Sequence, residues 1–331
     1  NGSSQNQLDK QGLTIYFTRS AVEFSRRKRM KLGMVGLGRM GGNMSERLLN
    51  DGHEVIVFDP DSSAVNTLAE KGASAASSLN DVVSQLEAPR TVWVMVPSGD
   101  ITESTVNELV ELLDEGDTLI DGGNSNYKES QRRGEHAAQS GIDFLDSGTS
   151  GGVWGLANGY CLTVGGNRNA YDRNRPIFKT LAPDDSDGNL HVGPSGSGHY
   201  VKMIHNGIEY GLMQAYAEGF ELLAAKEDFN LDLGAIAENW TRGSVIRSWL
   251  LDLTVDELEK DPHLDELSSY VDDSGEGRWT VEASVELAVP APVITAALQM
   301  RFRSRQSNPL GGKMLAAMRN GFGGHAVKKA D

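Results

Sequence analysis

The chain has 331 residues, with 46 Asp and Glu against 31 Lys and Arg, and a formal net charge of −15. Its length suggests about two domains of ordinary size, and its single cysteine, Cys161, excludes an internal disulfide framework. The acidic balance disfavours nucleic-acid binding, which depends on clustered Lys and Arg. No apolar run approaches the roughly 20 residues of a membrane helix. We therefore expect a cytoplasmic protein that binds neither nucleic acid nor membrane.

Residues 1–29 differ in composition from the rest of the chain. They carry six basic and two acidic residues and end in the cluster Arg26-Arg27-Lys28-Arg29. A signal peptide would have its basic residues before an apolar stretch, whereas here they come last. We interpret residues 1–29 as an extension outside the folded unit; a basic targeting tract is the alternative.

The first predicted strand, residues 32–35, leads directly into a glycine-rich turn and a helix. The turn reads Gly36-Leu37-Gly38-Arg39-Met40-Gly41, and a second predicted strand ends at Asp59, 23 positions after Gly36. In a dinucleotide-binding turn, Gly36 would permit the sharp bend, Gly38 the approach of a pyrophosphate, and Gly41 close packing of helix on strand. The helix N-terminus would offer N–H groups to the anion. The pattern predicts a dinucleotide site; a structural turn is the alternative.

Asp59 also bears on the choice of cofactor. A carboxylate at this position can accept hydrogen bonds from the ribose hydroxyls of NAD but would repel the additional phosphate of NADP. No Arg or Lys occurs in Asp59-Pro60-Asp61-Ser62-Ser63. NAD is therefore favoured and NADP remains possible, unless Asp59 only forms a solvated Asp-Pro turn.

Further strands are predicted at residues 91–96, 118–121, 143–146 and 160–164, alternating with helical stretches. This order is typical of a parallel, doubly wound Rossmann-type sheet with helices on both faces. Glycine-rich breaks follow two of the strands, where Asn124 and Ser150 could bind a small polar ligand. Ligands of such sheets bind at the carboxyl ends of the strands. We expect a dinucleotide-binding domain over residues 30–187 and an all-helical substrate-binding domain over residues 188–331.

The second domain begins with a predicted helix over residues 199–226. Its apolar stripe, Ile204, Ile208, Leu212 and Ala215, is expected to pack on a core. A second stripe contains five different functional groups at helical spacing: Lys202, His205, Asn206, Glu209 and Tyr210. Such variety fits a ligand cleft, whereas a solvated face is the usual place for charged residues. Without further information the two interpretations are equally balanced.

The string from Gly198 to Gly211, Gly-His-Tyr-Val-Lys-Met-Ile-His-Asn-Gly-Ile-Glu-Tyr-Gly, closely resembles the signature of decarboxylating 6-phosphogluconate dehydrogenases. The segments Asp121-Gly122-Gly123-Asn124-Ser125, residues 147–152, Arg278-Trp279-Thr280 and residues 319–325 resemble the same family. The resemblance extends from Met30 to His325. The wider β-hydroxyacid dehydrogenase superfamily shares the glycine turn and a helix lysine, but not the His-Asn-Gly-Ile-Glu-Tyr block.

The resemblance implies a reaction and roles for individual residues. The substrate, 6-phosphogluconate, would be oxidised at its third carbon, lose carbon dioxide and give ribulose 5-phosphate, a step of the pentose phosphate pathway that needs no metal. Lys202 would act as general base and then general acid, Glu209 would protonate the product carbon, and Asn206 would assist. Cofactor contacts would be residues 36–41, Asp59, Val96 and Asn124. Substrate contacts would be Asn124, Ser150, Gly151, Gly152, His205, Asn206, Tyr210, Arg301, Arg319 and His325.

Arg319 and His325 would complete a phosphate site in a neighbouring subunit, so the resemblance implies a homo-oligomer. The chain departs from the long form of the family: it is shorter, and Ser274 stands where long forms commonly have a lysine. Two other functions remain open. A 3-hydroxyisobutyrate-type dehydrogenase would act on a small unphosphorylated acid, and a non-catalytic sensor would bind NAD without turnover.

Overall fold

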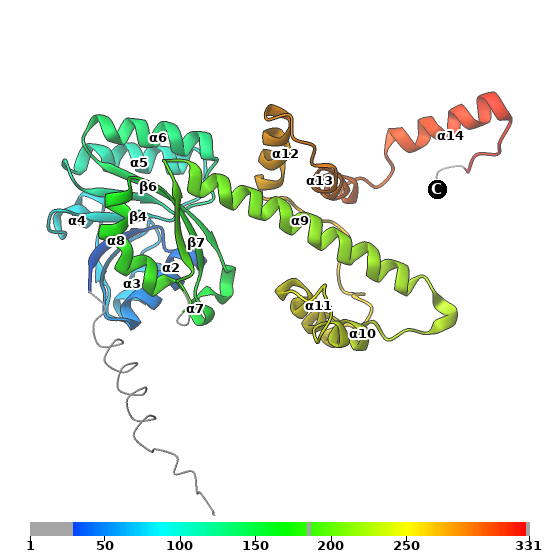
Figure 1. Cartoon of the computed structure of the whole chain (residues 1–331), viewed down its shortest axis with the longest axis horizontal. Coiled ribbons are helices and arrows are strands. Elements are labelled where there is room, and N and C mark those ends of the chain that lie inside the picture. Colours follow the sequence, from blue (N-terminus) through cyan, green and yellow to red (C-terminus); the bar gives the residue numbers. More distant parts are fainter. Residues whose placement is uncertain (1–28, 184–186, 329–331) are drawn as a thin grey trace, which may run out of the picture. The chain divides into compact units, whose positions relative to one another are not determined.

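The computed structural model describes residues 29–183 and 187–328 (Figure 1). Contacts divide the chain into two units, one up to Lys202 and the other from Met203 onward. Each unit is described by itself. The predicted extension, apart from Arg29, lies outside the described residues. None of the helices in the described part of the chain combines the length and apolar character that a membrane crossing requires.

The first unit contains one sheet, whose eight strands in the described residues have the order β3-β2-β1-β4-β5-β6-β7-β8. The strands are β1 (Lys31–Val35), β2 (Glu54–Phe58), β3 (Ser74–Ala75), β4 (Thr91–Val94), β5 (Thr118–Asp121), β6 (Asp143–Ser150), β7 (Cys161–Gly166) and β8 (Asn189–Gly193). The order, which runs outward in both directions from β1 and β4, confirms the predicted doubly wound sheet.

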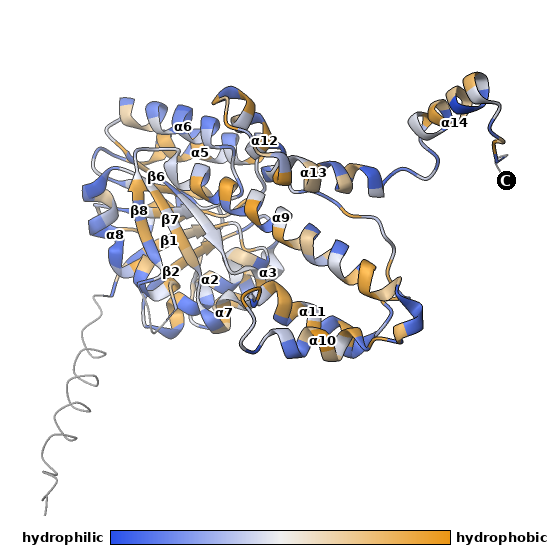
Figure 2. Ribbon diagram, turned by 45° about the vertical axis from the view of Figure 1, so that its right-hand side comes forward, coloured by the Kyte–Doolittle hydropathy of each residue, from blue (hydrophilic) through white to orange (hydrophobic). Residues whose placement is uncertain are grey.

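Helices cover both faces of this sheet, as predicted. Leu32 and Met34 of β1 pack in one core cluster with Met44 of α2, whereas Val35 packs in a second cluster with Val106 of α5. Alternate residues of a strand face opposite sides of the sheet, so the two clusters lie on its two faces. Hydrophobic residues dominate its central strands (Figure 2). The helices are α2 (Arg39–Asn50), α3 (Ser62–Ala69), α4 (Leu79–Ser84), α5 (Asp100–Leu112), α6 (Tyr127–Gln139), α7 (Gly155–Asn158) and α8 (Arg168–Leu181).

The sheet is not parallel throughout, which corrects the prediction. Strands β6 and β7 pair antiparallel, with Ser147 opposite Val164. Residues 151–160 between them contain only the 3₁₀ turn η1 (Gly152–Trp154) and the single-turn α7. This connection is too short for a parallel crossover, which needs a dozen residues or more. Strand β8 then pairs parallel with β7.

Strand β8 lies beyond residue 187, where the sequence suggested that the dinucleotide-binding domain ends. The contacts group β8 and the first residues of α9 (Ser197–Ala224) with the sheet. β8 is a short strand at the edge of the sheet, with too few residues to show a clear alternation of apolar and polar side chains. The glycines around it resemble those of a linker. The division into domains over residues 30–187 and 188–331 stays a prediction.

The second unit is helical, in agreement with the predicted fold class. After the part of α9 that begins at Met203, it contains η2 (Glu227–Phe229), α10 (Leu233–Trp240), α11 (Trp249–Lys260), α12 (Glu276–Glu286), α13 (Pro292–Ser304) and α14 (Leu310–Gly323). One small core joins α10 and α11 with Tyr216 and Phe220 of α9. Another contains Tyr210 of α9 and Ala297 and Leu298 of α13.

The predicted long helix exists as α9, but the prediction of its buried face was wrong within the chain. Ile208 and Leu212 of the apolar stripe are 53% and 45% exposed. The buried residues of this part of α9 include Met203, Gly207 and Tyr210. Gly207 leaves room for α12, because a Cβ there would lie 2.6 Å from the Thr280 methyl group. Periodicity marks an apolar stripe, but close helix packing on a glycine decided which face is covered.

Candidate functional site

The turn after β1 has the geometry expected for each of its three glycines. Gly36 has a φ of 90°, and a Cβ there would lie 2.4 Å from the Met95 carbonyl oxygen. A Cβ at Gly41 would lie 2.0 Å from the Gly36 oxygen, whereas one at Gly38 would have no atom within 4 Å. Gly38 is also the N-cap of α2 and has no side chain to bond its first N–H groups. The turn therefore leaves open the side at which a pyrophosphate would approach, which fits a dinucleotide. Leu37 is buried, Arg39 is exposed and Met40 is half-buried.

Asp59 lies immediately after β2, and its carboxylate is held against this turn. Its Oδ2 accepts a hydrogen bond from the Leu37 N–H at 2.7 Å, and its Oδ1 accepts one from the Asp61 N–H at 2.8 Å. Asp61 caps α3, and hydrogen bonds from Ser63 hold the pKa of its carboxyl below its usual value. Two aspartate side chains therefore follow β2. They favour ribose hydroxyls, which donate hydrogen bonds, over the additional phosphate of NADP.

The sheet brings several predicted contacts to one edge. Strands β1, β2, β4, β5 and β6 are parallel, so their carboxyl ends meet there. Gly36 and Asp59 directly follow β1 and β2, Val96 lies two residues after β4, Asn124 lies three residues after β5, and Ser150 ends β6. Asn124 is exposed and Ser150 is half-buried. In sheets of this type, this edge is the place where ligands bind.

Ser150, Gly151 and Gly152 form the turn from β6 into η1. Gly151 has a φ of 132° and Gly152 a φ of 50°, and Gly152 is exposed. A Cβ at Gly151 would lie 3.2 Å from the Gly159 carbonyl oxygen at the end of α7. The positive φ angles of both residues therefore favour glycine in this turn.

The start of α9 is anchored on the sheet by a buried carboxylate. Asp146 of β6 accepts hydrogen bonds from the Gly196 N–H at 2.6 Å and from the His199 N–H at 2.8 Å. The His199 ring Nδ1 lies 2.7 Å from the Ser130 hydroxyl of α6. A carboxylate at a helix N-terminus is favoured by the partial positive charge of the N–H groups. These bonds fix the first turn of α9, and Lys202 lies in the next turn.

Lys202 itself packs directly on β6. A Cβ at Gly148 would lie 2.4 Å from the Lys202 Cβ and 2.7 Å from both the Gly198 carbonyl oxygen and the Thr163 hydroxyl. Only a residue without a side chain therefore allows α9 to lie this close to the strand. Lys202 is half-buried, and Gly148, on which it packs, lies two residues before the end of β6.

The predicted polar stripe continues along α9 into the second unit. His205 Nδ1 lies 3.0 Å from Asn206 Oδ1 and 3.9 Å from Glu209 Oε2, so neighbouring members of the stripe contact one another. His205 is exposed, whereas Asn206 and Glu209 are half-buried. These residues are therefore neither fully exposed to solvent nor buried in a core.

Tyr210 differs from the rest of the stripe because it is buried. Its hydroxyl oxygen accepts a hydrogen bond from the Ser274 N–H at 3.0 Å and lies 3.3 Å from the Ser274 hydroxyl. The guanidinium of Arg301 lies 3.5 Å from the centre of the Tyr210 ring and donates to the Asp272 carbonyl oxygen at 2.7 Å. The structure thus brings together Tyr210, Arg301 and Ser274 in the second unit.

Arg319 and His325 belong to a different part of the second unit. Arg319 is on α14, which has no buried residue, and His325 follows this helix. The Asn320 amide donates a hydrogen bond to the His325 carbonyl oxygen at 2.8 Å. Both predicted residues are therefore exposed, and α14 buries none of its own residues against the part of the chain that the structure describes.

Sequence reasoning missed the charged groups that lie behind these loops. Arg133 on α6 has only 1% of its side chain exposed and lies 3.3 Å from the fully buried Asp121. In the second unit, hydrogen bonds from Arg278 and then Arg305 lower the pKa of Asp273, next to Ser274, to about 2. No local pattern could reveal these pairs, since charged residues on helices are usually solvated. The one available signal was an aspartate at the end of a buried strand, before two glycines.

Comparison with known proteins identifies relatives along most of the chain. Residues 31–193 match the family described as the NAD binding domain of 6-phosphogluconate dehydrogenase, and residues 198–309 match its C-terminal domain. The chain is 45% identical over 303 residues to an NAD(+)-dependent, decarboxylating 6-phosphogluconate dehydrogenase of Haloferax volcanii. This alignment covers 91% of the chain and all of the relative.

Two further relatives are longer than this chain. A decarboxylating 6-phosphogluconate dehydrogenase of Lactococcus lactis is 36% identical over 289 residues, which cover 82% of the chain and 61% of that protein. The structure is similar to that of Plasmodium falciparum 6-phosphogluconate dehydrogenase, with a TM-score of 0.76 and 25% identity. That similarity covers 91% of this chain and 67% of the other. The chain thus matches the short relative at full length and only part of the longer ones.

Proposed function

Because the chain belongs to the 6-phosphogluconate dehydrogenase family, we propose that it converts 6-phosphogluconate and NAD into ribulose 5-phosphate, carbon dioxide and NADH. The observation that carries the proposal is the full-length similarity to the Haloferax volcanii relative, whose name specifies NAD and decarboxylation. The chain is accordingly an oxidoreductase that acts with a nicotinamide cofactor. The polar stripe of α9 supports this substrate over a small unphosphorylated acid, since it matches the family signature throughout.

The glycine turn and Asp59 fit the nicotinamide dinucleotide, which supplies a hydride acceptor when bound. Gly38 leaves room for the pyrophosphate, and Asp59, fixed by the Leu37 N–H, retains oxygen lone pairs for ribose hydroxyls. Asp61 adds a second negative charge and no Arg or Lys follows, so NAD is favoured over NADP. NADP remains a possible second cofactor.

We assign the proton transfers to Lys202 and Glu209. Lys202 removes the hydroxyl proton as the hydride leaves the third carbon of the substrate, and then returns a proton to the ketone oxygen as carbon dioxide departs. Glu209 protonates the first carbon of the enediol. The two residues are seven positions apart on α9, which places them on the same side of one helix. Asn206 lies between them and orients the substrate, together with His205.

The remaining proposed substrate contacts lie on both units. Ser150, Gly151 and Gly152 offer a hydroxyl and backbone N–H groups after β6, and Asn124 offers an amide after β5. Tyr210 and Arg301 form a packed pair in the second unit, and Arg301 supplies a guanidinium suited to a phosphate. Ser274, bonded to Tyr210, can offer only a hydroxyl where long forms have a lysine. Arg319 and His325 would provide the missing positive charge.

We propose that the active form is a homo-oligomer in which α14 reaches a neighbouring subunit. In this chain α14 exposes the apolar side chains of Leu310, Met314, Leu315, Met318 and Phe322. Ile208 and Leu212 of α9 are further exposed apolar side chains of the second unit. Apolar exposure of this extent is typical of interfaces between subunits. The cytoplasmic location expected from the sequence stays a prediction.

The assay that tests the function measures NADH and carbon dioxide together. Purified protein is incubated with 6-phosphogluconate and either NAD or NADP, and parallel reactions contain 3-hydroxyisobutyrate. We expect one carbon dioxide for each NADH, with faster reduction of NAD. Turnover of 3-hydroxyisobutyrate alone would identify the rival dehydrogenase, and NAD binding without turnover of either acid would identify a sensor.

Two variants test the site. Lys202→Met should abolish turnover but preserve NAD binding, whereas the same change at Lys226, just after α9, should leave both intact. A chain truncated after Arg305 should be folded but inactive. Mixing the Lys202→Met chain with the truncated chain should restore activity, because each provides what the other lacks. No recovery in mixed oligomers would contradict the role of α14 in a neighbouring site.

A further inference from the structure

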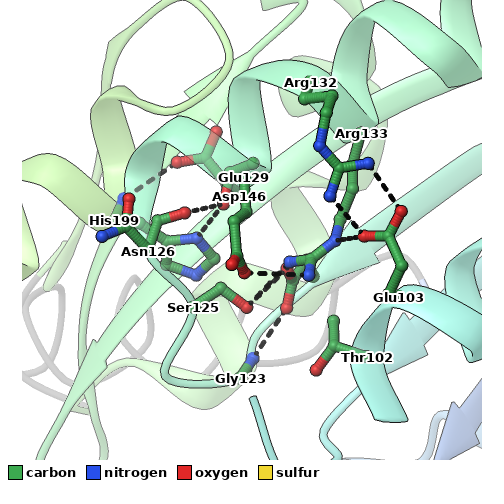
Figure 3. Close-up of polar contacts among 12 residues, drawn as sticks. Thr102, Glu103, Gly123, Ser125, Asn126, Glu129, Arg132, Arg133, Asp146 and His199 are labelled. Atoms are coloured by element: carbon green, nitrogen blue, oxygen red, sulfur yellow. Dashed lines mark hydrogen bonds and ion pairs between the residues drawn. The ribbon is translucent and has the colours of Figure 1, made fainter. Parts of the chain in front are cut away.

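Arg133 of α6 is a buried cation behind the loop that follows β5 (Figure 3). Its Nη1 lies 3.3 Å from both Asp121 Oδ2 and Ser125 Oγ. Its Nε donates to Glu103 Oε2 at 2.9 Å, and its Nη2 donates to Glu129 Oε2 at 3.0 Å. A charge with only 1% of its side chain exposed is costly unless it is paired and hydrogen-bonded. These four partners therefore hold the guanidinium in one orientation.

Asp121 determines the shape of the loop. Its Oδ1 accepts a hydrogen bond from the Gly123 N–H at 3.1 Å, and its Oδ2 accepts one from the Ser125 hydroxyl at 2.8 Å. The loop therefore folds around a fully buried carboxylate, and Asn124 is left exposed beside the buried Ser125. Arg133 contacts the same oxygen, Oδ2, and brings a positive charge to this carboxylate. Without that cation, Asp121 would be a buried charge bound only to neutral donors.

Glu103 connects the same network to the helix that follows the neighbouring strand, β4. It lies in the first turn of α5, the helix that follows β4 and the residues around Val96. Arg133 thus ties the loop after β5 to the helix after β4. The two loops also touch, because a Cβ at Gly123 would lie 3.0 Å from the Val96 carbonyl oxygen. Val96 and Asn124 are the contacts that these loops are expected to offer to the cofactor.

We propose that Arg133 is a positioning residue, which through Asp121 and Ser125 holds the loop that presents Asn124 to the nicotinamide cofactor and the substrate. This role rests on the proposed function, since that function assigns Asn124 to the site. Arg133 acts from behind the loop, through the groups it binds. Residues that hold the supporting contacts of a site orient the groups that touch the ligand.

The adjacent Arg132 provides a matched control. Its guanidinium donates to both oxygens of Glu103, at 2.6 and 2.7 Å, but its side chain is 58% exposed. Arg133→Met should raise the dissociation constant for NAD and lower kcat/KM by about 10- to 100-fold, the scale of a displacement of about 1 Å. Arg132→Met should leave both values close to those of the wild type. Equal effects of the two changes, or no effect of Arg133→Met, would overturn the proposal.

NAD binding, measured by titration without substrate, keeps this test separate from the proposed function. If the wild type binds NAD but does not turn over 6-phosphogluconate, the function fails while the comparison of NAD affinities still decides the role of Arg133. A purely structural role would reduce the folded fraction and hence the apparent kcat, but it would leave KM and the NAD dissociation constant unchanged.

If Arg133→Met does not fold, the double variant Asp121→Asn/Arg133→Met replaces it. This variant removes both buried charges together, which is far less costly than removing one. It retains an amide oxygen that can accept the Gly123 N–H bond. We expect it to fold and to bind NAD more weakly than Arg132→Met. Wild-type affinity in the double variant would refute the positioning role.

Discussion

Replacing Gly148 with alanine is expected to displace Lys202 while leaving the dinucleotide turn in place. The new Cβ would lie 2.4 Å from the Lys202 Cβ and 2.7 Å from the Gly198 carbonyl oxygen. Gly148 has no positive φ, so alanine is compatible with its backbone conformation. The perturbation is therefore purely a matter of space between β6 and α9. It tests whether the reaction depends on the close packing of Lys202 against β6.

The size of the effect follows from these distances. Carbon atoms in contact are ordinarily about 3.5–4.0 Å apart, so α9 and β6 must separate by more than about 1 Å. Inserting a methyl group into a packed site costs about 1–3 kcal/mol of unfolding free energy. A shift of about 1 Å in a reacting group can reduce the rate by about 100-fold. We expect Gly148→Ala to lower kcat by about this factor, because the proposed mechanism uses Lys202 both to remove the hydroxyl proton and to return a proton to the ketone oxygen.

The assay compares kcat, the NAD dissociation constant and the free energy of unfolding in Gly148→Ala with those of two other proteins. One is the wild type. The other is Gly219→Ala, also on α9, where a Cβ has no atom within 4 Å and alanine favours the helix by up to about 1 kcal/mol. Gly219→Ala should retain the wild-type kcat, and its free energy of unfolding should be no lower than that of the wild type. A folded Gly148→Ala protein with wild-type kcat would refute the reasoning, whether NAD binding changed or not.

Three further predictions concern the first unit. Gly38→Ala should fold normally, because its Cβ meets no atom, but it should bind NAD more weakly. In Gly41→Ala the Cβ would lie 2.0 Å from a backbone oxygen, so this change should lower the unfolding free energy by about 1–3 kcal/mol. Calorimetry and NAD titration separate the two, and similar destabilisation by both would contradict the assigned roles. Asp59→Ser removes a charged acceptor and should therefore weaken NAD binding about tenfold or more. It should also increase the ratio of kcat/KM with NADP to kcat/KM with NAD. An unchanged ratio would argue against Asp59 as the group that discriminates between the two cofactors. The pKa of Glu103 is lowered from 4.5 to about 2, mainly by hydrogen bonds from Arg132. Its stabilising effect is therefore complete above pH 4.5 and is lost as the pH falls towards 2. Thermal unfolding across this range should show a weaker pH dependence in Glu103→Gln, and parallel curves would refute the assignment.

The sequence alone determined the parts of this protein that depend on local order. The turn Gly36–Gly41, the acidic residue at position 59 and the long helix that carries Lys202 each follow from spacing within a short segment. A glycine needed for a tight turn, or an apolar period of a helix, is visible in a few consecutive residues. The family signature around Lys202 also lies within 14 consecutive residues, 198–211.

Only the tertiary structure decided which segments meet. The antiparallel pairing of β6 and β7 depends on the path of a short connection, and the covered face of α9 depends on the approach of α12 to Gly207. From the sequence, Arg133 resembles an ordinary solvated residue. In the folded chain it lies beside Asp121 and is almost completely buried. Charges and glycines acquire these roles through neighbours that are distant along the chain. Burial and pairing are properties of the assembled core, so no local pattern contains them.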